Sequence, residues 1–450
     1  MQAGDAFFMV NPAKVQLERS RNMKSMDDIK RMIEEEDVEF IRLQFTDIFG
    51  RLKNIAVTPG QMDKIFMNRF AVDGSSVFND CYEYDDELYL HPEPDTFMIL
   101  PWRPKQGKVA KVVCDICHAD GSPFLMSSRT ILKNVLLDIL DHGYSIMADP
   151  ECEFFLFHTD ENGLPTTNSH EMAGYLDVSP ADFGENARRD IVLMLEEMGF
   201  EVESSHHEHA PAQHEIDFKE AEALETADNI QTFRFAVRSI AKRFGLYATF
   251  MPKPKTDVAG SAMHLNFTLL KDGRNVFNRN GTESEEARFF IGGILKHARG
   301  LAAIANPIVN SYKRLLGCSA PNEINWSDKG EKSLIRLHRG GEETKVELRF
   351  PDGASNPYLL LAVCIAAGMD GIKNKIDPGE AARCKDGLNN FEKMPIDLKE
   401  AVDCLQSDPV LIAALGEEFA KVYADIKYRE WGDFMSDVSA WEIDHYLNRI

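Results

Sequence analysis

The sequence predicts an α+β protein made of a small strand-rich domain followed by a larger domain of helices and strands. Its 450 residues are enough for two or three domains. Apolar and polar residues alternate with period two in the first part of the chain, and helical periodicity appears between strand-like segments further on. We expect an N-terminal extension over residues 1–26, a strand-rich domain over 27–118 and a second domain over 125–450.

The small domain begins with a predicted helix and continues mainly as strands. The segment DDIKRMIEEE at 27–36 has the spacing of a helix. Residues 39–57 alternate on both sides of Asp47 and Gly50, which predicts a hairpin with its turn at those two residues. Further strands are expected at 88–90, 96–100 and 109–114.

The second domain opens with a strong helix signal. Ser127 or Ser128 is a suitable N-cap, an apolar stripe follows, and Gly143 is a suitable end. Two more helices are expected at 185–198 and 228–244, with strands between the helices. From about residue 356 the pattern is mostly helical.

Composition limits the classes of partner. The formal net charge is -23, and a surface this acidic repels nucleic acid and anionic lipid, so neither is expected as a partner. No apolar run reaches the length of a membrane span, and the first ten residues lack a secretory pattern. The eight scattered cysteines fit reduced thiols, so a cytoplasmic location is expected.

Four short segments place polar side chains on one strand face and hydrocarbon on the other. The alternation of side chains along a strand assigns these residues to the polar faces. They are Glu151 and Glu153; Glu215 and Asp217; His264, Asn266 and Thr268; Lys345, Glu347 and Arg349. An ordinary antiparallel sheet with one face in water explains any single segment. If the four strands are neighbours, however, their carboxylates converge and require cations.

The residue types indicate which cations such a site would hold. Oxygen ligands with one imidazole suit Mg²⁺ or Mn²⁺ better than Zn²⁺, and two such metals beside arginines suit phosphoryl transfer. A further stretch, 205–215, holds four His and two Glu in eleven residues. A polar surface loop is the plain interpretation, and Pro211 together with the absence of HExxH spacing disfavours a zinc protease.

Several motifs, taken in order, resemble type I glutamine synthetases. The similarity runs from about residue 27 to 450, and it is nearer to the γ-glutamyl-amine ligase branch than to a strict glutamine synthetase. The motifs are DGSS at 73–76, ECEFFLF at 151–157, GENARRDI at 184–191, SHHEHAPAQHEIDF at 205–218, ATFMPKP at 248–254, GSAMH at 260–264, NSYKR at 310–314 and KVELRFPD at 345–352. Each motif alone is a weak signal, whereas their shared order and spacing is specific.

The resemblance implies a fold, a reaction and an assembly. The fold is an N-terminal β-grasp domain and a catalytic domain with a curved antiparallel sheet, a half-barrel with flanking helices. The reaction is an ATP-dependent joining of glutamate to an amine through a γ-glutamyl phosphate, with two or three Mg²⁺ or Mn²⁺ ions. The assembly is a homo-oligomer, a dodecamer of two hexameric rings in which the DGSS loop completes the neighbouring subunit's site.

The resemblance also implies roles for particular residues. Glu153, Glu208 and Glu215 match the ligands of the first metal, and Glu151, His264 and Glu347 those of the second. Asn266, Thr268 and Arg336 match nucleotide contacts. Gly260 and Arg314 match the groups that bind the glutamate backbone, Arg349 the group on the reacting carboxylate, and Asp73 and Tyr175 the ammonium pocket. Asp73, Arg314 and Arg349 are the expected catalytic residues.

The sequence departs from the family pattern around the substrates. Ala259 stands where the family has an Asn that helps to bind glutamate, and the flap after NSYKR is one residue shorter, with Ser319 in place of a Glu. Glu331 stands where a phosphate-binding Arg is expected. The segment 77–82 differs from the usual IEGF, and its Phe78 and Tyr82 offer aromatic contact to an amine if they lie near the pocket.

Three functions remain open at this stage. Loss of a carboxylate weakens a preference for the ammonium cation and leaves room, which favours a ligase for an amine other than ammonia. An ordinary glutamine synthetase that tolerates these losses is the second, and a non-catalytic ring-forming protein is the third. The intact set of metal-ligand positions argues against the third.

Overall fold

The structure is a computed structural model of the chain. It describes residues 24–67, 70–79, 81–103, 106–279, 281–317, 320–329, 332–382 and 391–449. Residues 1–23 of the extension expected over 1–26, and the departures at Ser319 and Glu331, therefore lie outside the described residues.

The N-terminal domain is a helix followed by a mixed sheet, in which β5 pairs with β6 beside the main strand order β2-β1-β6-β4-β3. The hairpin forms where it was predicted, because the Asp47 carboxylate accepts the backbone N–H groups of Phe49 and Arg51 at 3.0 and 2.8 Å, and Gly50 supplies a φ of 79°. The elements are α2 (Met26–Glu35), β1 (Val38–Thr46), β2 (Leu52–Val57), α3 (Met62–Phe66), β3 (Ala71–Asp73), β4 (Glu87–Pro92), β5 (Met98–Ile99) and β6 (Lys108–Cys117).

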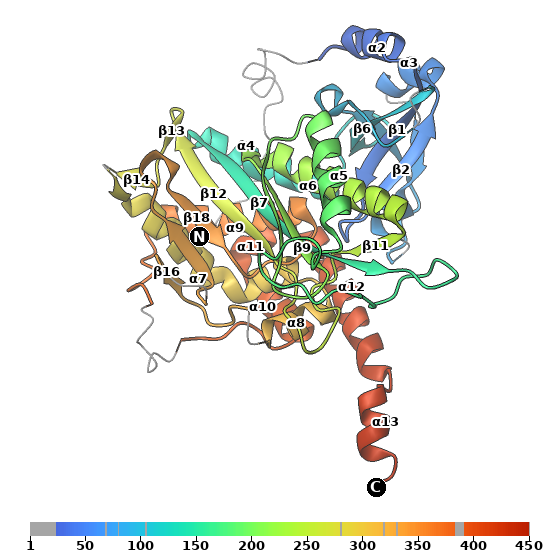
Figure 1. Cartoon of the computed structure of the whole chain (residues 1–450). Coiled ribbons are helices and arrows are strands. Elements are labelled where there is room, and N and C mark those ends of the chain that lie inside the picture. Colours follow the sequence, from blue (N-terminus) through green and yellow to red (C-terminus); the bar gives the residue numbers. More distant parts are fainter. Residues whose placement is uncertain are drawn as a thin grey trace.

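The second domain is built on a sheet with the order β16-β17-β18-β12-β7-β9-β8 (Figure 1). Except for the parallel pair β16–β17, the neighbours along this path are antiparallel. Its strands are β7 (Tyr144–His158), β8 (Val202–His207), β9 (Gln213–Phe218), β12 (Met263–Lys271), β16 (Trp326–Ser327), β17 (Ile335–His338) and β18 (Lys345–Leu348), with β10 (Ala221–Glu222), β11 (Leu246–Thr249) and β13 (Arg274–Asn275) at the margins. The predicted α+β class is confirmed.

Helices cover the apolar face of this sheet, and α13 projects from the body at the C-terminal end (Figure 1). The expected helix at 228–244 begins earlier, at Ala223, because its first turns are buried by tertiary contacts and not marked by a cap. The helices are α4 (Ser128–Asp141), α5 (Glu185–Glu197), α6 (Ala223–Ala241), α7 (Glu285–Ala305), α8 (Val309–Leu315), α9 (Pro357–Asn374), α10 (Leu398–Gln406), α11 (Pro409–Leu415), α12 (Glu417–Ser436) and α13 (Ala440–Tyr446). In the described part of the chain, no helix is both long and apolar enough to span a bilayer.

A buried ion-pair network joins the two domains. Arg129 on α4 donates two hydrogen bonds to Asp228 on α6, at 3.0 and 2.9 Å, and a third to Asp115 on β6. Lys133 also donates to Asp115, and the Tyr358 hydroxyl donates to Asp228 at 2.7 Å. Although burial alone raises the pKa of Asp115, Arg129 and Lys133 hold that pKa well below its ordinary value. The network therefore fixes the β-grasp sheet against the helices behind the large sheet.

Candidate functional site

The polar faces of the four strands meet on one side of the large sheet. His264 on β12 lies opposite Glu151 on β7 in the strand register. Asn266, two residues further along β12, lies opposite Glu347 on β18. On the other side of β7, Glu153 lies opposite Glu215 on β9. Side chains scattered over almost 200 residues of sequence are thus brought to one surface.

One compact group consists of Glu151, His264 and Glu347, whose ligand atoms lie within 4.8 Å of one another. His264 Nδ1 is 2.9 Å from Glu151 Oε2 and 3.4 Å from Glu347 Oε1. Burial lowers the pKa of His264, but the two carboxylates more than offset this and raise it above the ordinary value. Although burial raises the pKa of Glu151, hydrogen bonds from His264 and Asn266 lower it to about 2. The carboxylates therefore favour a protonated His264, which must lose its proton before the group can hold a metal ion.

A second compact group consists of His206, Glu208 and Glu215. His206 Nε2 lies 3.1 Å from Glu208 Oε1 and 3.9 Å from Glu215 Oε2. Burial and the surrounding carboxylates, first of them Glu153, raise the pKa of Glu215 to about 12. A carboxyl group that is buried and repelled by neighbouring carboxylates is stabilised by binding either a proton or a cation.

The second group differs in one respect from the ligands expected on resemblance. His206 belongs to it together with Glu208 and Glu215, whereas the resemblance implied Glu153 as their companion. The signal was available in the alternation of β8, since His206 lies opposite Glu215 in the register. Glu153 lies beside the group, where its carboxylate accepts hydrogen bonds from Gln213 Nε2 at 2.7 Å and from the Ala262 N–H at 3.0 Å.

The donor chemistry of both groups fits divalent metal ions. Each contains two carboxylates and one imidazole, which suits Mg²⁺ or Mn²⁺ better than the sulfur-rich or tetrahedral sites of zinc. The raised pKa of Glu215 supports the same conclusion, because a cation would relieve the repulsion that otherwise keeps a proton there. Metal ions held here would neutralise phosphate charge during phosphoryl transfer.

Metal binding is expected to release protons. With its pKa raised to about 12, Glu215 is protonated in the metal-free protein, and His264 is protonated over a wider pH range than a free histidine. Mn²⁺ affinity should therefore rise from about pH 6 to about pH 8, with roughly one proton or more released per chain. Calorimetry in buffers of different ionisation enthalpy measures both quantities. Equal heats in all buffers, with an affinity that does not change with pH, would contradict the conclusion that Glu215 and His264 lose protons when metal binds.

An arginine pair lies at one end of the metal groups. Arg314 on α8 is buried and donates to the Phe350 and Arg349 carbonyl oxygens at 2.8 and 3.1 Å. The Arg349 guanidinium donates to Glu347 Oε1 at 2.8 Å, and its buried Nε has no hydrogen-bond partner among the described residues. Gly260 packs directly over Arg314, because a Cβ at that glycine would lie 2.3 Å from the Pro252 carbonyl oxygen and 3.1 Å from Arg314 Cγ. The arrangement suits a carboxylate ligand.

The residues expected to contact the nucleotide lie towards the other end. Asn266 donates to Glu151 Oε1 at 3.0 Å, and the Thr268 hydroxyl donates to Glu220 Oε2 at 3.1 Å. Arg336 on β17 is half-buried and lies opposite Glu347 in the register. All three therefore belong to the same polar surface as the metal groups.

Sequence reasoning missed a charged cluster at this end of the site. Lys345 Nζ lies 3.1 Å from Asp149 Oδ2 and 3.4 Å from Glu220 Oε2. Burial raises the pKa of Asp149 to about 7, despite the lysine that opposes this change. Lys345 was recognised as a polar-face residue, but its partners come from other strands and loops and have no local sequence signal.

The two residues expected at the amine pocket are placed differently. The Tyr175 ring stacks on His209, with ring centroids 4.5 Å apart, and meets His206 edge-on at 5.6 Å, so it lies beside the second metal group. Asp73 lies on the β-grasp domain, where its carboxylate accepts the Ser75 N–H at 2.9 Å. Among the described residues of one chain, Asp73 makes no hydrogen bond or ion pair with the second domain.

Two departures from the family pattern are visible in the structure. Ala259 packs against an apolar cluster that includes Phe155 and Phe157, so no polar group extends from position 259. Phe78 is fully buried in the domain core, 5.0 Å from the Tyr82 ring, which is half-buried. The expectation that Phe78 offers a face to an amine is therefore wrong within one chain, because its ring is buried against other residues of the domain core.

Comparison with known proteins gives the same picture as the fold and the site. The family model described as the glutamine synthetase β-grasp domain matches residues 37–119, and that described as the glutamine synthetase catalytic domain matches residues 125–446. The fold and these groups define an ATP-dependent ligase with divalent metal ions. The chain belongs to the glutamine synthetase family.

Individual relatives carry two different names. A glutamine synthetase of Clostridium saccharobutylicum is 48% identical over 94% of this chain and 98% of its own length, and one of Staphylococcus aureus (strain MW2) is 45% identical with the same coverage. Two solved structures of GmaS, one with ADP and one without ligand, are 31% and 32% identical and cover 93% and 94% of this chain. Each covers 99% of its own chain with a TM-score of 0.86.

Proposed function

We propose that this protein joins glutamate to an amine other than ammonia, with cleavage of ATP. The observation that carries the proposal is the contrast between the two carboxylate and imidazole groups and a flap that lacks the carboxylate expected beside the amine. All six expected metal-ligand residues lie on or beside one polar surface, whereas Ser319 stands in the flap where the resemblance implies a Glu. A site that keeps its phosphoryl-transfer groups but changes its amine contacts has altered its acceptor.

The proposed chemistry has two steps. A γ-carboxylate oxygen of glutamate attacks the terminal phosphorus of ATP, ADP leaves, and an acyl phosphate forms. The amine nitrogen then attacks the acyl carbon, phosphate leaves, and the nitrogen loses a proton. Metal ions held by the two carboxylate and imidazole groups would neutralise phosphate charge in the first step.

The arginine pair orients the acid in this scheme. Arg314 holds the α-carboxylate beside the Gly260 backbone, and Arg349 holds the reacting carboxylate with its Nε, which has no hydrogen-bond partner in the part of the chain that the structure describes. The hydrogen bond from Arg349 to Glu347 fixes the guanidinium next to the group formed by Glu151, His264 and Glu347. Asn266, Thr268 and Arg336 bind the nucleotide from the neighbouring strands.

The amine side is completed by a second subunit. Asp73 makes no hydrogen bond or ion pair with the second domain of its own chain among the described residues, although its carboxylate suits an amine cation. We propose that Asp73 reaches the site of a neighbouring subunit, facing Tyr175 and His209. A homo-oligomer follows from this, and the family pattern implies a dodecamer of two hexameric rings.

Phosphate release with a panel of amines tests the proposal. Purified protein receives ATP, Mg²⁺, glutamate and one amine at a time: ammonium, methylamine, ethanolamine, putrescine or spermidine. Release is expected to be fastest with an organic amine, and mass spectrometry identifies the γ-glutamyl amide. The similarity to the solved GmaS structures, together with the resemblance to γ-glutamyl-amine ligases, makes methylamine the first amine to try. Release with ammonium alone would sink the proposal.

Ordinary glutamine synthesis is the second candidate. The 48% identity with a clostridial glutamine synthetase favours it, since that exceeds the 32% identity with a GmaS structure. Efficient formation of glutamine at low ammonium concentration, with no product from organic amines, is the result that would establish it.

A further inference from the structure

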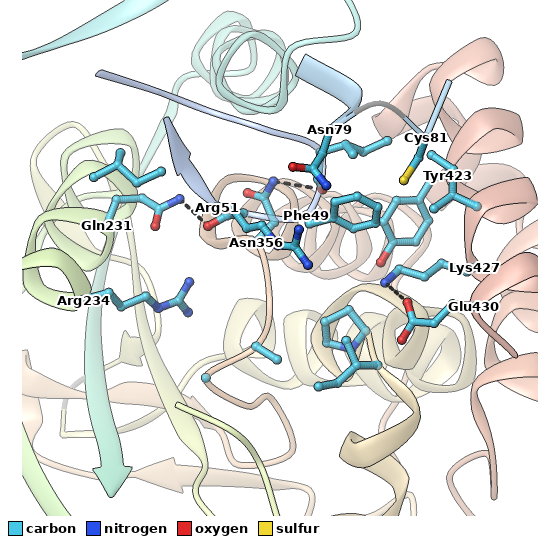
Figure 2. A pocket seen from close by; sticks show the side chains of 18 of the residues that line it. Phe49, Arg51, Asn79, Cys81, Gln231, Arg234, Asn356, Tyr423, Lys427 and Glu430 are labelled. Carbon is cyan, nitrogen blue, oxygen red and sulfur yellow. Dashed lines mark hydrogen bonds and ion pairs between the residues drawn. The ribbon is translucent and has the colours of Figure 1, made fainter. Parts of the chain in front are cut away.

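A cavity of about 790 Å³ lies between the two domains, outside the metal groups. The β1–β2 hairpin of the small domain forms one wall, α6 and α12 form two others, and the loop over 353–356 forms part of the floor (Figure 2). Figure 2 shows Arg51 reaching in from the hairpin and Arg234 from α6, with Lys427 on the opposite side. The cavity is large enough for a metabolite of ordinary size.

The lining is positively charged, in contrast to the protein as a whole. Two carboxylates, Glu430 and Asp433, face five basic side chains, although the chain has a net charge of -23. The five are Arg51, Arg234, Arg238, Lys427 and Arg429. Low-dielectric walls concentrate the field of such a group, so that the cavity attracts anions.

Some of these cations already have partners. Lys427 donates to Glu430 at 2.8 Å and lies over the rings of Phe49 and Tyr423, and Arg429 donates to the Cys81 carbonyl oxygen at 2.6 Å. These contacts hold α12 against the small domain and account for one side of the cavity.

The other three arginines have no carboxylate within ion-pair distance among the described residues. Arg234 is only 5% exposed, donates to the Ser355 carbonyl oxygen at 2.9 Å, and has its pKa lowered to about 10 by burial. Arg238, one turn further along α6, is exposed and lies over the Phe250 ring. Arg51 lies over the Phe49 ring. A buried guanidinium without a counter-charge is costly, and an anion removes that cost.

We propose that this interdomain cavity binds a small anion through its carboxylate or phosphate group, held between Arg51, Arg234 and Arg238. Guanidinium groups match the planar oxygen pairs of both chemistries. The anion contacts both domains at once, because Arg51 belongs to the hairpin and the other two arginines belong to α6.

One segment of the chain connects the cavity to the catalytic site through hydrogen bonds. The segment that follows β18 begins at Arg349 and ends at Asn356, whose side chain donates to the Asp47 and Ile48 carbonyl oxygens of the hairpin. At its start, Arg314 holds the Arg349 carbonyl oxygen, and near its end Arg234 holds that of Ser355. An anion on Arg234 therefore acts on the segment that positions the catalytic arginine, and it modulates activity without entering the catalytic site.

Calorimetry on the full-length, metal-free protein tests the proposal with sulfate, succinate and ribose 5-phosphate as probes. At least one probe is expected to bind saturably, and the preferred probe separates carboxylate from phosphate ligands. Arg51→Gln and Arg238→Gln should each weaken binding by at least about tenfold. Arg243→Gln is the matched control, since Arg243 is exposed in the short helix Lys242–Phe244 that directly follows α6.

The pattern among the variants decides the outcome. Full binding in Arg349→Gln, together with weakened binding in Arg51→Gln and Arg238→Gln, supports the interdomain site. The proposal is overturned if none of the three probes binds saturably, if binding is lost only in Arg349→Gln, or if Arg243→Gln weakens binding equally. Since Arg51 and Arg238 side chains form no hydrogen bond among the described residues, both variants are expected to fold.

Discussion

Replacing Glu347 by glutamine is expected to lower kcat by about a hundredfold to a thousandfold. Glu347 contacts His264 at 3.4 Å, His338 at 2.6 Å and Arg349 at 2.8 Å. The substitution removes a charge from one metal group and leaves a neutral amide oxygen, in place of a carboxylate, to accept the hydrogen bond of Arg349. Losing one preorganised electrostatic contact has an effect of this order, and here a second contact is weakened as well.

Steady-state phosphate release, with metal content measured on the same sample, is the relevant assay. Glu203→Gln is the matched control, because Glu203 lies on β8 of the same sheet but is exposed and outside both metal groups. The control should keep wild-type activity. If Glu347→Gln retains activity within about threefold while binding metal normally, the role assigned to this group of residues is incorrect.

Replacing Arg129 by methionine is expected to destabilise the protein by about 3 to 5 kcal/mol. The methionine keeps the apolar stem but leaves Asp115 and Asp228 buried without their shared cation. Arg129 is 4% exposed, so water does not replace the lost hydrogen bonds. Because the network joins β6 to α4 and α6, the small domain is expected to loosen from the large one.

Urea denaturation at fixed protein concentration measures this effect, since an oligomer's apparent stability depends on concentration. Arg31→Met provides the comparison, because the ion pair of Arg31 with Asp28 at 2.7 Å is exposed and should contribute much less than the buried network. Equal losses in the two variants would show that the buried network does not hold the domains together.

The sequence predicted those features that depend on local patterns. The hairpin turn was predictable because Asp47 and Gly50 carry its geometry in their own residue types. The polar faces at Glu151 and His264 were predictable from alternation alone. Local signals of this kind set the position of the hairpin turn and the polar faces of the strands, so both predictions agree with the structure.

Features that depend on contacts between residues far apart in the sequence were harder to predict. The position of His206 in the second group follows from its register against Glu215. The buried position of Phe78 follows from packing against Tyr82 and Phe124. Neither partner is marked in the local sequence. The start of α6 at Ala223 was missed for the same reason, since burial and not a capping residue fixes it.

The sequence alone predicts the residues of the two metal groups better than it predicts the residues that recognise the amine. The ligand types of the metal groups are restrictive, because carboxylates with imidazole on one wet face have few other uses. The amine side depends on Asp73, which makes no hydrogen bond or ion pair with the second domain of its own chain among the described residues, and on the flap position of Ser319, which lies outside them. Under the proposed function, recognition of the acceptor amine therefore involves a neighbouring subunit as well as this chain.

A competition experiment tests the central claim most directly. The protein is incubated with ATP, Mg²⁺, glutamate and equal concentrations of ammonium and methylamine, and the ratio of γ-glutamylmethylamide to glutamine is measured by mass spectrometry. The same competition is run with ethanolamine and putrescine in place of methylamine. The proposed function predicts that an organic amide dominates in at least one mixture. Predominance of glutamine in every mixture would contradict it and return the protein to ammonia assimilation.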